Sequence, residues 1–248
     1  MATLSLTGSM RSLAWTAQHA VAVDVVVFTV QGRGAPPHAR AADGGADQGT
    51  LKVLLVRRDQ PPFRGDWALP GGRVGSEESV DAAALRALQE DTSIGNIYLE
   101  QLYTFGDPTR DPRGRVLTVS YYALVSAAEL SGPSATWFPV KRLPRLAFDH
   151  RRIIDYALER LRSKINYTTV GFQLLPPAFT LTDLQHCYEV ILGQRLDKRN
   201  FRRKMLQLGI LRATRQFKMN GRQRPAKLYT FMQPKVIKLQ ERGIIVPF

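Results

Sequence analysis

Apolar and polar positions follow two different periodicities along the chain. In the first half, short apolar runs rich in β-branched residues predict strands at 20–30, 51–56, 97–103 and 116–125. The run from Ala20 to Val30 is almost continuously apolar, which is typical of a strand buried on both faces. Residues 31–49, rich in Gly, Ala, Pro and Asp, predict a long loop.

The second half shows helical periodicity. Residues 150–164 carry Ile153, Ile154, Ala157, Leu158 and Leu161 on one side, which predicts an amphipathic helix. Residues 167–177, interrupted by Gly and Pro, read as a linker. A helix capped by Thr180 or Thr182 and ended by Gly193 follows, and a second helix runs from about 198 to 208. Two strands around a basic turn at 218–224 complete the order of a winged helix-turn-helix.

These elements predict four segments: an N-terminal arm (1–19), an α+β domain (20–148), a helix with a linker (149–177) and a winged helix-turn-helix (178–248). The 248 residues, 44% of them hydrophobic, are enough for two cores. There is no apolar run of about 18 residues and no apolar block of signal-peptide kind, so we expect an uncleaved, cytoplasmic chain without membrane contact. The single cysteine, Cys187, excludes an internal disulfide and has the neighbours of a core thiol.

Charge is distributed unequally between the two halves. Residues 1–140 hold 12 Lys/Arg and 14 Asp/Glu, whereas residues 141–248 hold 23 and 7, out of a net charge of +14. This asymmetry predicts two modules, the second of which faces a polyanion.

The second helix of the helix-turn-helix concentrates this charge. Phe201, Met205 and Leu208 should face the core, which leaves Arg199, Arg203 and Gln207 on the opposite face. Such a face can contact base edges in a major groove while its neighbours bind phosphates; the alternative is an ordinary solvated helix. Candidate contacts to double-stranded DNA are Thr182, Lys198, Arg199, Asn200, Arg202, Arg203, Lys204, Gln207, Lys218, Arg222, Arg224 and Lys227.

The stretch from Trp67 to Ile94 carries the candidate chemistry of the first domain. Gly71 and Gly72 predict a turn in which positive φ brings backbone N–H groups close to a phosphate. In the helix expected next, Glu77 and Glu78 should lie in the first turn, and Glu90 and Asp91 near the end. Positions 87, 90 and 91 share one helix face, where carboxylates can hold a divalent cation.

This stretch resembles the Nudix box of nucleoside-diphosphate hydrolases, with Gly72, Glu78, Arg86, Leu88, Glu90, Asp91 and Ile94 in matching positions. The resemblance implies an α/β/α sandwich with a mixed sheet. Residues 137–145 resemble the closing strand and turn of such a domain, which implies a boundary near residue 148. Ala87 and Ser93 depart from the box, and in the family the residue at position 87 is a metal-binding Glu. We therefore expect a vestigial Mg²⁺ site at Glu90 and Asp91, no required cofactor and negligible hydrolysis. An ordinary loop and surface helix is the alternative.

Two cationic segments accompany the box. Arg57 and Arg58 follow a predicted strand and either bind a phosphate or cap the strand end. The segment 110–114, RDPRG, resembles Nudix proteins of the ADP-ribose type, although a solvated hairpin loop would have a similar composition. Candidate ligand-binding residues are Arg57, Arg58, Gly71, Gly72, Glu78, Arg110 and Asp111.

The two halves together resemble the NrtR family of Nudix-related transcriptional regulators, most closely in the phrases FTLTDLQ, LDKRNFRRK and RPAKLY. The resemblance implies a homodimeric repressor of NAD biosynthesis or salvage genes, with ADP-ribose or a related NAD metabolite as effector. The rival hypothesis is an active Mg²⁺-dependent ADP-ribose pyrophosphatase. A third is a nucleic-acid-binding adaptor with an empty Nudix domain.

Overall fold

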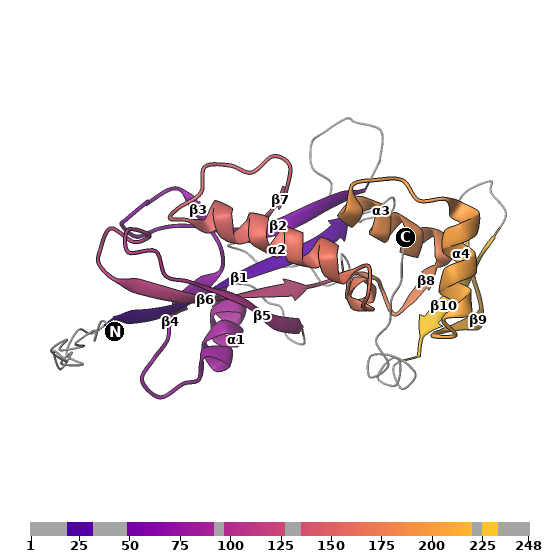
Figure 1. Ribbon diagram of the computed structural model, residues 1–248, viewed down its shortest axis with the longest axis horizontal. Coiled ribbons are helices and arrows are strands. Elements are labelled where there is room, and N and C mark those ends of the chain that lie inside the picture. The colour runs from indigo at the N-terminus through magenta and orange to yellow at the C-terminus, as the bar shows by residue number, and fades with distance from the viewer. Residues whose placement is uncertain (1–18, 32–48, 92–96, 127–134, 220–224, 233–248) are drawn as a thin grey trace, which may run out of the picture.

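A computed structural model of the chain describes residues 19–31, 49–91, 97–126, 135–219 and 225–232, with the side chain of Asp91 outside this part. The predicted arm and most of the predicted loop at 31–49 therefore lie outside the described residues. Figure 1 shows a mixed sheet at one end of the molecule, a small helical domain at the other, and helix α2 running between them.

The larger sheet is built around one central strand. Its strands are β1 (Ala20–Gln31), β2 (Thr50–Arg57), β3 (Trp67–Ala68), β4 (Gly71–Arg73), β5 (Tyr98–Phe105), β6 (Val116–Leu124) and β7 (Ala135–Pro139). Strand β1 is parallel to β6 and antiparallel to β2 and β4, so the sheet is mixed. This confirms the predicted α+β class and the strands on which it depended.

Strand β1 is buried on both faces, as its continuous apolar run predicts. Val23, Val25 and Val27 pack in the apolar cluster that includes helix α1 (Val80–Asp91). Val26 and Phe28 point to the other side, into the cluster that contains helix α2 (His150–Lys164). Because successive side chains of a strand alternate between faces, the two helices cover opposite sides of one sheet (Figure 1).

The C-terminal domain follows α2. It consists of the 3₁₀-helix η3 (Val170–Leu174), β8 (Ala178–Thr180), α3 (Leu181–Leu192), α4 (Lys198–Gln207), β9 (Leu211–Lys218) and β10 (Ala226–Phe231). Its three strands pair antiparallel in the order β8-β10-β9. The predicted linker is in part wrong, because Val170, Phe172 and Leu174 are buried and fold residues 170–174 into the core.

Helix α3 shows how local sequence sets an element's limits. Thr180 accepts a hydrogen bond from the Asp183 N–H at 3.0 Å, and the Asp183 carboxylate accepts one from the Thr180 N–H, so Thr180 rather than Thr182 is the N-cap. Gly193 ends the helix with a left-handed φ of 72°.

Helix α1 begins later than the sequence pattern predicts. Its first residue is Val80, so Glu77 and Glu78 lie in the preceding turn and the prediction of a first-turn position is wrong. The Ser79 hydroxyl accepts a hydrogen bond from the Ala82 N–H at 3.1 Å, the contact of a helix cap. The Glu78 carboxylate turns back to the Gly75 N–H at 2.7 Å.

One of the two apolar clusters extends through both domains. The cluster on the α2 side of the sheet includes Phe28 of β1, Leu161 of α2, Ile191 of α3 and Phe201 of α4. Helix α2 therefore packs against both domains at once. Among the described residues, no helix has the length and apolarity needed to cross a membrane.

Candidate functional site

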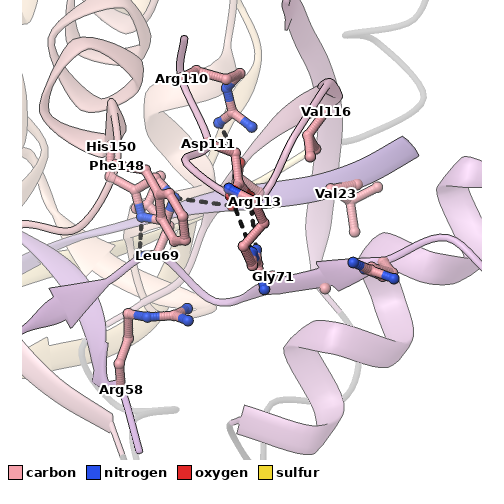
Figure 2. A pocket seen from close by; sticks show the side chains of 14 residues that line it. Val23, Arg58, Leu69, Gly71, Arg110, Asp111, Arg113, Val116, Phe148 and His150 are labelled. Carbon is pink, nitrogen blue, oxygen red and sulfur yellow. Dashed lines mark hydrogen bonds and ion pairs between the residues drawn. The ribbon is translucent and has the colours of Figure 1, made fainter. Parts of the chain in front are cut away.

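A pocket of about 320 Å³ opens beside the end of β1. Its walls come from β1, the end of β2, strand β4, the loop at 110–116 and the residues that begin α2 (Figure 2). It is lined by Ala22, Val23, Asp24, Arg58, Leu69, Gly71, Gly72, Arg73, Arg110, Asp111, Arg113, Val116, Phe148 and His150.

The structure brings together most of the predicted ligand-binding residues. Arg58, Gly71, Gly72, Arg110 and Asp111 line this pocket, whereas Arg57 and Glu78 are not among its lining residues. Arg57 is exposed and donates from Nε to the Gly65 carbonyl at 3.3 Å.

Gly71 and Gly72 lie in the extended strand β4, and neither has a positive φ. The prediction of a positive-φ turn is therefore wrong. A Cβ atom on Gly71 would lie 2.4 Å from the Val23 carbonyl oxygen, so glycine is needed there for β4 to approach β1. Gly72 has open space around the equivalent position. Close strand packing, rather than left-handed backbone, explains the glycine at position 71.

A buried ion-pair network forms the floor of the pocket. Arg110 donates to both oxygens of Asp149, at 2.7 and 3.0 Å, and its Nη2 lies 3.4 Å from Asp24. Asp24 also accepts from the Thr118 hydroxyl at 2.8 Å. Only 4% of the Arg110 side chain is exposed. Arg110 therefore pairs with two carboxylates, the buried Asp24 and the partly buried Asp149, and the predicted ligand contact would have to compete with both.

His150 joins this network with a defined tautomer. Its Nδ1 accepts the Leu69 N–H at 2.9 Å, so the ring proton lies on Nε2, which faces Asp24 at 3.3 Å. Burial lowers the pKa of His150 below its usual value, although the neighbouring Asp24 and Asp149 oppose the shift. The neutral ring ties the first turn of α2 to Asp24 of β1 and to Leu69, which lies between β3 and β4.

Arg58 and Arg113 place two further cations at the pocket. Arg58 donates to the carbonyls of Pro62 and Gln60 at 2.9 and 3.3 Å, and Arg113 binds Asp111 at 2.7 Å. Burial and the charge of Arg113 lower the pKa of Arg58. Two like charges near one another favour an anion between them, and guanidinium groups match the geometry of phosphate oxygens.

The acidic face of α1 is organised by Arg86. Its guanidinium lies 2.6 Å from Glu78 and 3.2 Å from Glu90. Hydrogen bonds from Arg86 and from the Gly75 N–H lower the pKa of Glu78 to about 2. Ala87, at the position of the missing carboxylate, is 2% exposed and packs in the apolar cluster under α1.

This donor set does not fit a resident Mg²⁺ ion. The two described carboxylates at box positions, Glu78 and Glu90, both pair with Arg86, and position 87 offers a methyl group. Within the described part of the chain, no three His, Cys, Asp or Glu side chains are grouped as metal ligands would be. The predicted ligand Asp91 has its side chain outside this part.

Helix α4 presents the predicted basic face. Phe201 and Met205 are buried, while Arg199, Arg203 and Gln207 are exposed. Arg203 donates to the Asn200 side-chain oxygen at 2.9 Å. The other predicted residues on α4, Lys198, Arg202 and Lys204, add positive charge. The Asp197 side chain caps the helix by accepting the Asn200 N–H at 2.8 Å.

The remaining predicted DNA contacts surround this helix. Thr182 on α3 accepts from Arg202 at 2.9 Å. Lys218 on β9 lies 3.3 Å from Asp183, and Lys227 on β10 is exposed. Arg222 and Arg224 lie outside the described residues.

Several residues at or near the two sites were not predicted from the sequence. The omitted pocket residues include Asp24, Arg73, Arg113, Phe148 and His150, and β9 carries two further exposed cations, Arg212 and Arg215, beside the predicted Lys218. Arg113 belongs to the RDPRG segment already singled out, so that motif could have indicated it. Phe148 and His150 sit at the predicted domain boundary, where no local pattern marks them as pocket residues.

Comparison with known proteins finds a matching family for each half of the chain. The sequence model of the NrtR DNA-binding winged helix domain matches residues 171–231, and that of the NUDIX domain matches residues 37–157. The ADPR responsive transcriptional repressor NtrR of Acinetobacter baylyi is 42% identical over 194 residues, 75% of this chain and 77% of the relative. An ADP-ribose pyrophosphatase of Methanocaldococcus jannaschii is 37% identical over 124 residues, 48% of this chain and 73% of the relative.

Solved structures give the same architecture. Shewanella oneidensis NrtR, crystallised with a 27mer DNA, superposes with a TM-score of 0.73 at 37% identity, covering 88% of this chain and 95% of that one. A MutT/nudix family protein from Enterococcus faecalis gives a TM-score of 0.66 at 29% identity, with 86% of each chain covered. The chain matches a repressor over three quarters of that repressor's length, and it shares the fold of the solved NrtR structure. It therefore belongs to the NrtR family of Nudix-related transcriptional regulators.

Proposed function

We propose that this protein is a transcriptional repressor that binds operator DNA through its winged helix and releases or retains it according to a nucleotide held in the Nudix pocket. The effector is ADP-ribose or a related NAD metabolite, and the regulated genes are those of NAD biosynthesis or salvage. The names of the relatives from Acinetobacter and Shewanella, a repressor responsive to ADPR and a protein crystallised with DNA, support both halves of the proposal.

One observation carries the proposal: helix α2 begins in the cationic pocket and ends on the basic DNA-binding domain. At its first turn, Asp149 and His150 contact Arg110 and the Leu69 N–H. In its last turn, Arg162 donates to the Ile191 carbonyl of α3 at 2.9 Å. A helix of 15 residues spans about 22 Å, so one rigid element joins the two sites.

The pocket residues divide into two roles. We assign the diphosphate of the effector to Arg58, Arg73 and Arg113, with the Asp111 carboxylate holding Arg113 in place at 2.7 Å. Arg110 acts as a positioning residue, because its charge is engaged by Asp149 and Asp24. Movement of the loop at 110–113 on binding would then shift Asp149 and with it the start of α2.

DNA recognition falls to α4 and the adjoining hairpin. Arg199 and Arg203 lie one helical turn apart and are exposed, which suits them to guanine edges in the major groove. Lys218, Lys227, Arg222 and Arg224 are assigned to phosphates. A homodimer would present two such helices to the half-sites of one operator.

Thermodynamic linkage relates nucleotide binding to DNA binding. A nucleotide that binds one arrangement of the two domains better than the DNA-bound one must weaken DNA binding by the same factor. A regulator that cleaved its own effector would erase the signal, so loss of the metal ligand at position 87 suits this role.

The alternative is an active ADP-ribose pyrophosphatase, the activity for which the Methanocaldococcus relative is named. The methyl group at position 87 and the pairing of Glu78 and Glu90 with Arg86 argue against it. A gel shift with the promoter nearest its own gene, with and without ADP-ribose, tests the main proposal. Incubation of ADP-ribose with Mg²⁺ and pure protein, followed by assay of AMP, tests the alternative. Turnover of about 1 per second or more would favour the enzyme.

A further inference from the structure

Phe148 is an aromatic side chain with unusual surroundings in the pocket. The guanidinium carbons of Arg58 and Arg113 lie 4.9 and 5.6 Å from its ring centroid (Figure 2). The Phe63 ring meets it edge-on at 4.9 Å, and the His150 ring lies 5.3 Å away. The ring is partly exposed and belongs to the pocket lining.

The backbone at this position is strained. Phe148 has a φ of 50° and Phe63 a φ of 64°, and within the described residues these are the two non-glycine residues with positive φ. A bulky aromatic residue rarely adopts this conformation, and such outliers gather at ligand-binding sites. The chain thus maintains an unfavourable backbone to hold two rings against each other at the pocket.

The charged lining residues can bind the phosphates and sugar hydroxyls of a nucleotide. Arg58, Arg73 and Arg113 provide charge for phosphates, and Asp111 and Asp24 are acceptors for hydroxyl groups. Among the pocket-lining residues, the flat apolar surface needed by a base is offered by Phe148, with two planar guanidinium groups near its ring.

We propose that Phe148 is the base-binding residue of the pocket and stacks on the planar base of a nucleoside diphosphate whose phosphates Arg58 and Arg113 hold. The side chain of Arg113 is 46% exposed while Asp111 holds it at 2.7 Å, so a phosphate can reach the guanidinium without removing the partner of the buried Asp111 carboxylate. The inference rests on the proposed function for the site, and it names the part of the ligand that the pocket selects. Sugar phosphates and inorganic anions lack the group that Phe148 recognises.

Calorimetry on the full-length protein tests this assignment with three probes: ADP-ribose, ADP and inorganic pyrophosphate. Phe148→Leu keeps apolar volume but removes the flat ring, and Phe148→Trp keeps a flat ring. Stacking of one base predicts a loss on the order of 10- to 100-fold in affinity for ADP-ribose and ADP in Phe148→Leu. Pyrophosphate affinity should stay at the wild-type value, and Phe148→Trp should bind all three probes nearly as wild type does.

Phe63→Leu is the matched control, because Phe63 has the same backbone conformation and touches the same ring but does not line the pocket. It should bind ADP-ribose within a few-fold of wild type. The assignment is overturned if Phe148→Leu binds ADP-ribose like wild type, or if it loses pyrophosphate affinity to the same extent. A wild-type protein that binds ADP through Phe148 but not ADP-ribose would support the base site and reject the proposed effector. One that binds pyrophosphate and neither nucleotide would overturn the base site.

Discussion

Arg162, in the last turn of α2, donates its Nε–H to the main-chain carbonyl of Ile191 at 2.9 Å. Ile191 lies in the last turn of α3, where carbonyl groups have no partner within their own helix. In the same helix end, the Glu189 carboxylate accepts a hydrogen bond from the Leu196 N–H at 2.9 Å, and this contact fixes the turn into α4. The contact therefore joins the helix that starts in the pocket to the helix pair that should face DNA.

Replacing Arg162 with Ala should uncouple the two sites. We expect ADP-ribose and DNA to bind separately with near wild-type affinity, while the factor by which one weakens the other falls about fivefold or more. Couplings of this kind are typically worth about 1–3 kcal/mol. DNA titrations at zero and saturating ADP-ribose measure the factor.

Arg151→Ala provides the control for this prediction. Arg151 lies on the same helix but is 63% exposed and pairs with Asp155 on the solvent side. Its replacement should leave the coupling factor unchanged. Equal coupling in Arg162→Ala and wild type would show that the signal passes elsewhere.

Ala87→Glu should destabilise the protein without creating a hydrolase. The methyl group of Ala87 is 2% exposed among apolar side chains, and Arg86 already serves Glu78 and Glu90. An unpaired buried carboxylate costs about 3 kcal/mol or more. Thermal unfolding and an AMP assay measure the two outcomes. Leu85→Glu, at a 40% exposed position of the same helix, should change stability by about 0.5 kcal/mol or less. A stable, hydrolytically active Ala87→Glu protein would contradict this account.

Arg199→Ala and Arg203→Ala should each reduce binding to operator by about 1–3 kcal/mol and reduce binding to scrambled duplex much less. Both side chains are exposed on the face of α4 opposite Phe201 and Met205. Lys227→Ala should instead weaken both duplexes alike and lower the salt slope by about one. Titrations at several salt concentrations separate the two patterns. Equal losses on both duplexes for the Arg variants would remove α4 from sequence recognition.

The buried His150 should make stability fall on acidification. Burial keeps its pKa below the usual value, so the unfolded chain takes up a proton below about pH 6.5 while the folded chain does not. Stability is therefore fully present above that pH and declines as the pH drops through it. His150→Asn keeps an acceptor near the Leu69 N–H and should lose less stability between pH 7.5 and 5.5 in urea unfolding.

His19→Asn serves as the exposed control for this pH effect. It should lose as much stability on acidification as the wild type. If His150→Asn shows the same loss as well, His150 does not cause the pH dependence.

Cys187 should be unreactive in the folded protein. The thiol is buried, as its apolar neighbours predict, and burial raises its pKa to about 12. At pH 8 the thiolate fraction is then on the order of one in ten thousand. A disulfide exchange reagent should label no thiol in native protein and one in urea; rapid labelling before unfolding would contradict the core position.

The sequence by itself determined the elements and the kind of each domain. The continuous apolar run of β1 indicated a doubly buried strand, and the spacing of Phe201 and Met205 indicated which face of α4 is exposed, because both depend on local periodicity. The basic second half was evident in the charge count. It pointed to a polyanion without any knowledge of packing.

The tertiary structure decided which charges are engaged and which are available. Arg110 looked like a free cation in sequence, but folding brings Asp149, 39 residues away, and Asp24, 86 residues away, to its guanidinium. Folding likewise placed His150 against the Leu69 N–H and Phe148 beside two arginines, at what the sequence marked merely as a boundary. Ion pairing and stacking depend on distances through space, and no local pattern of residues contains those distances.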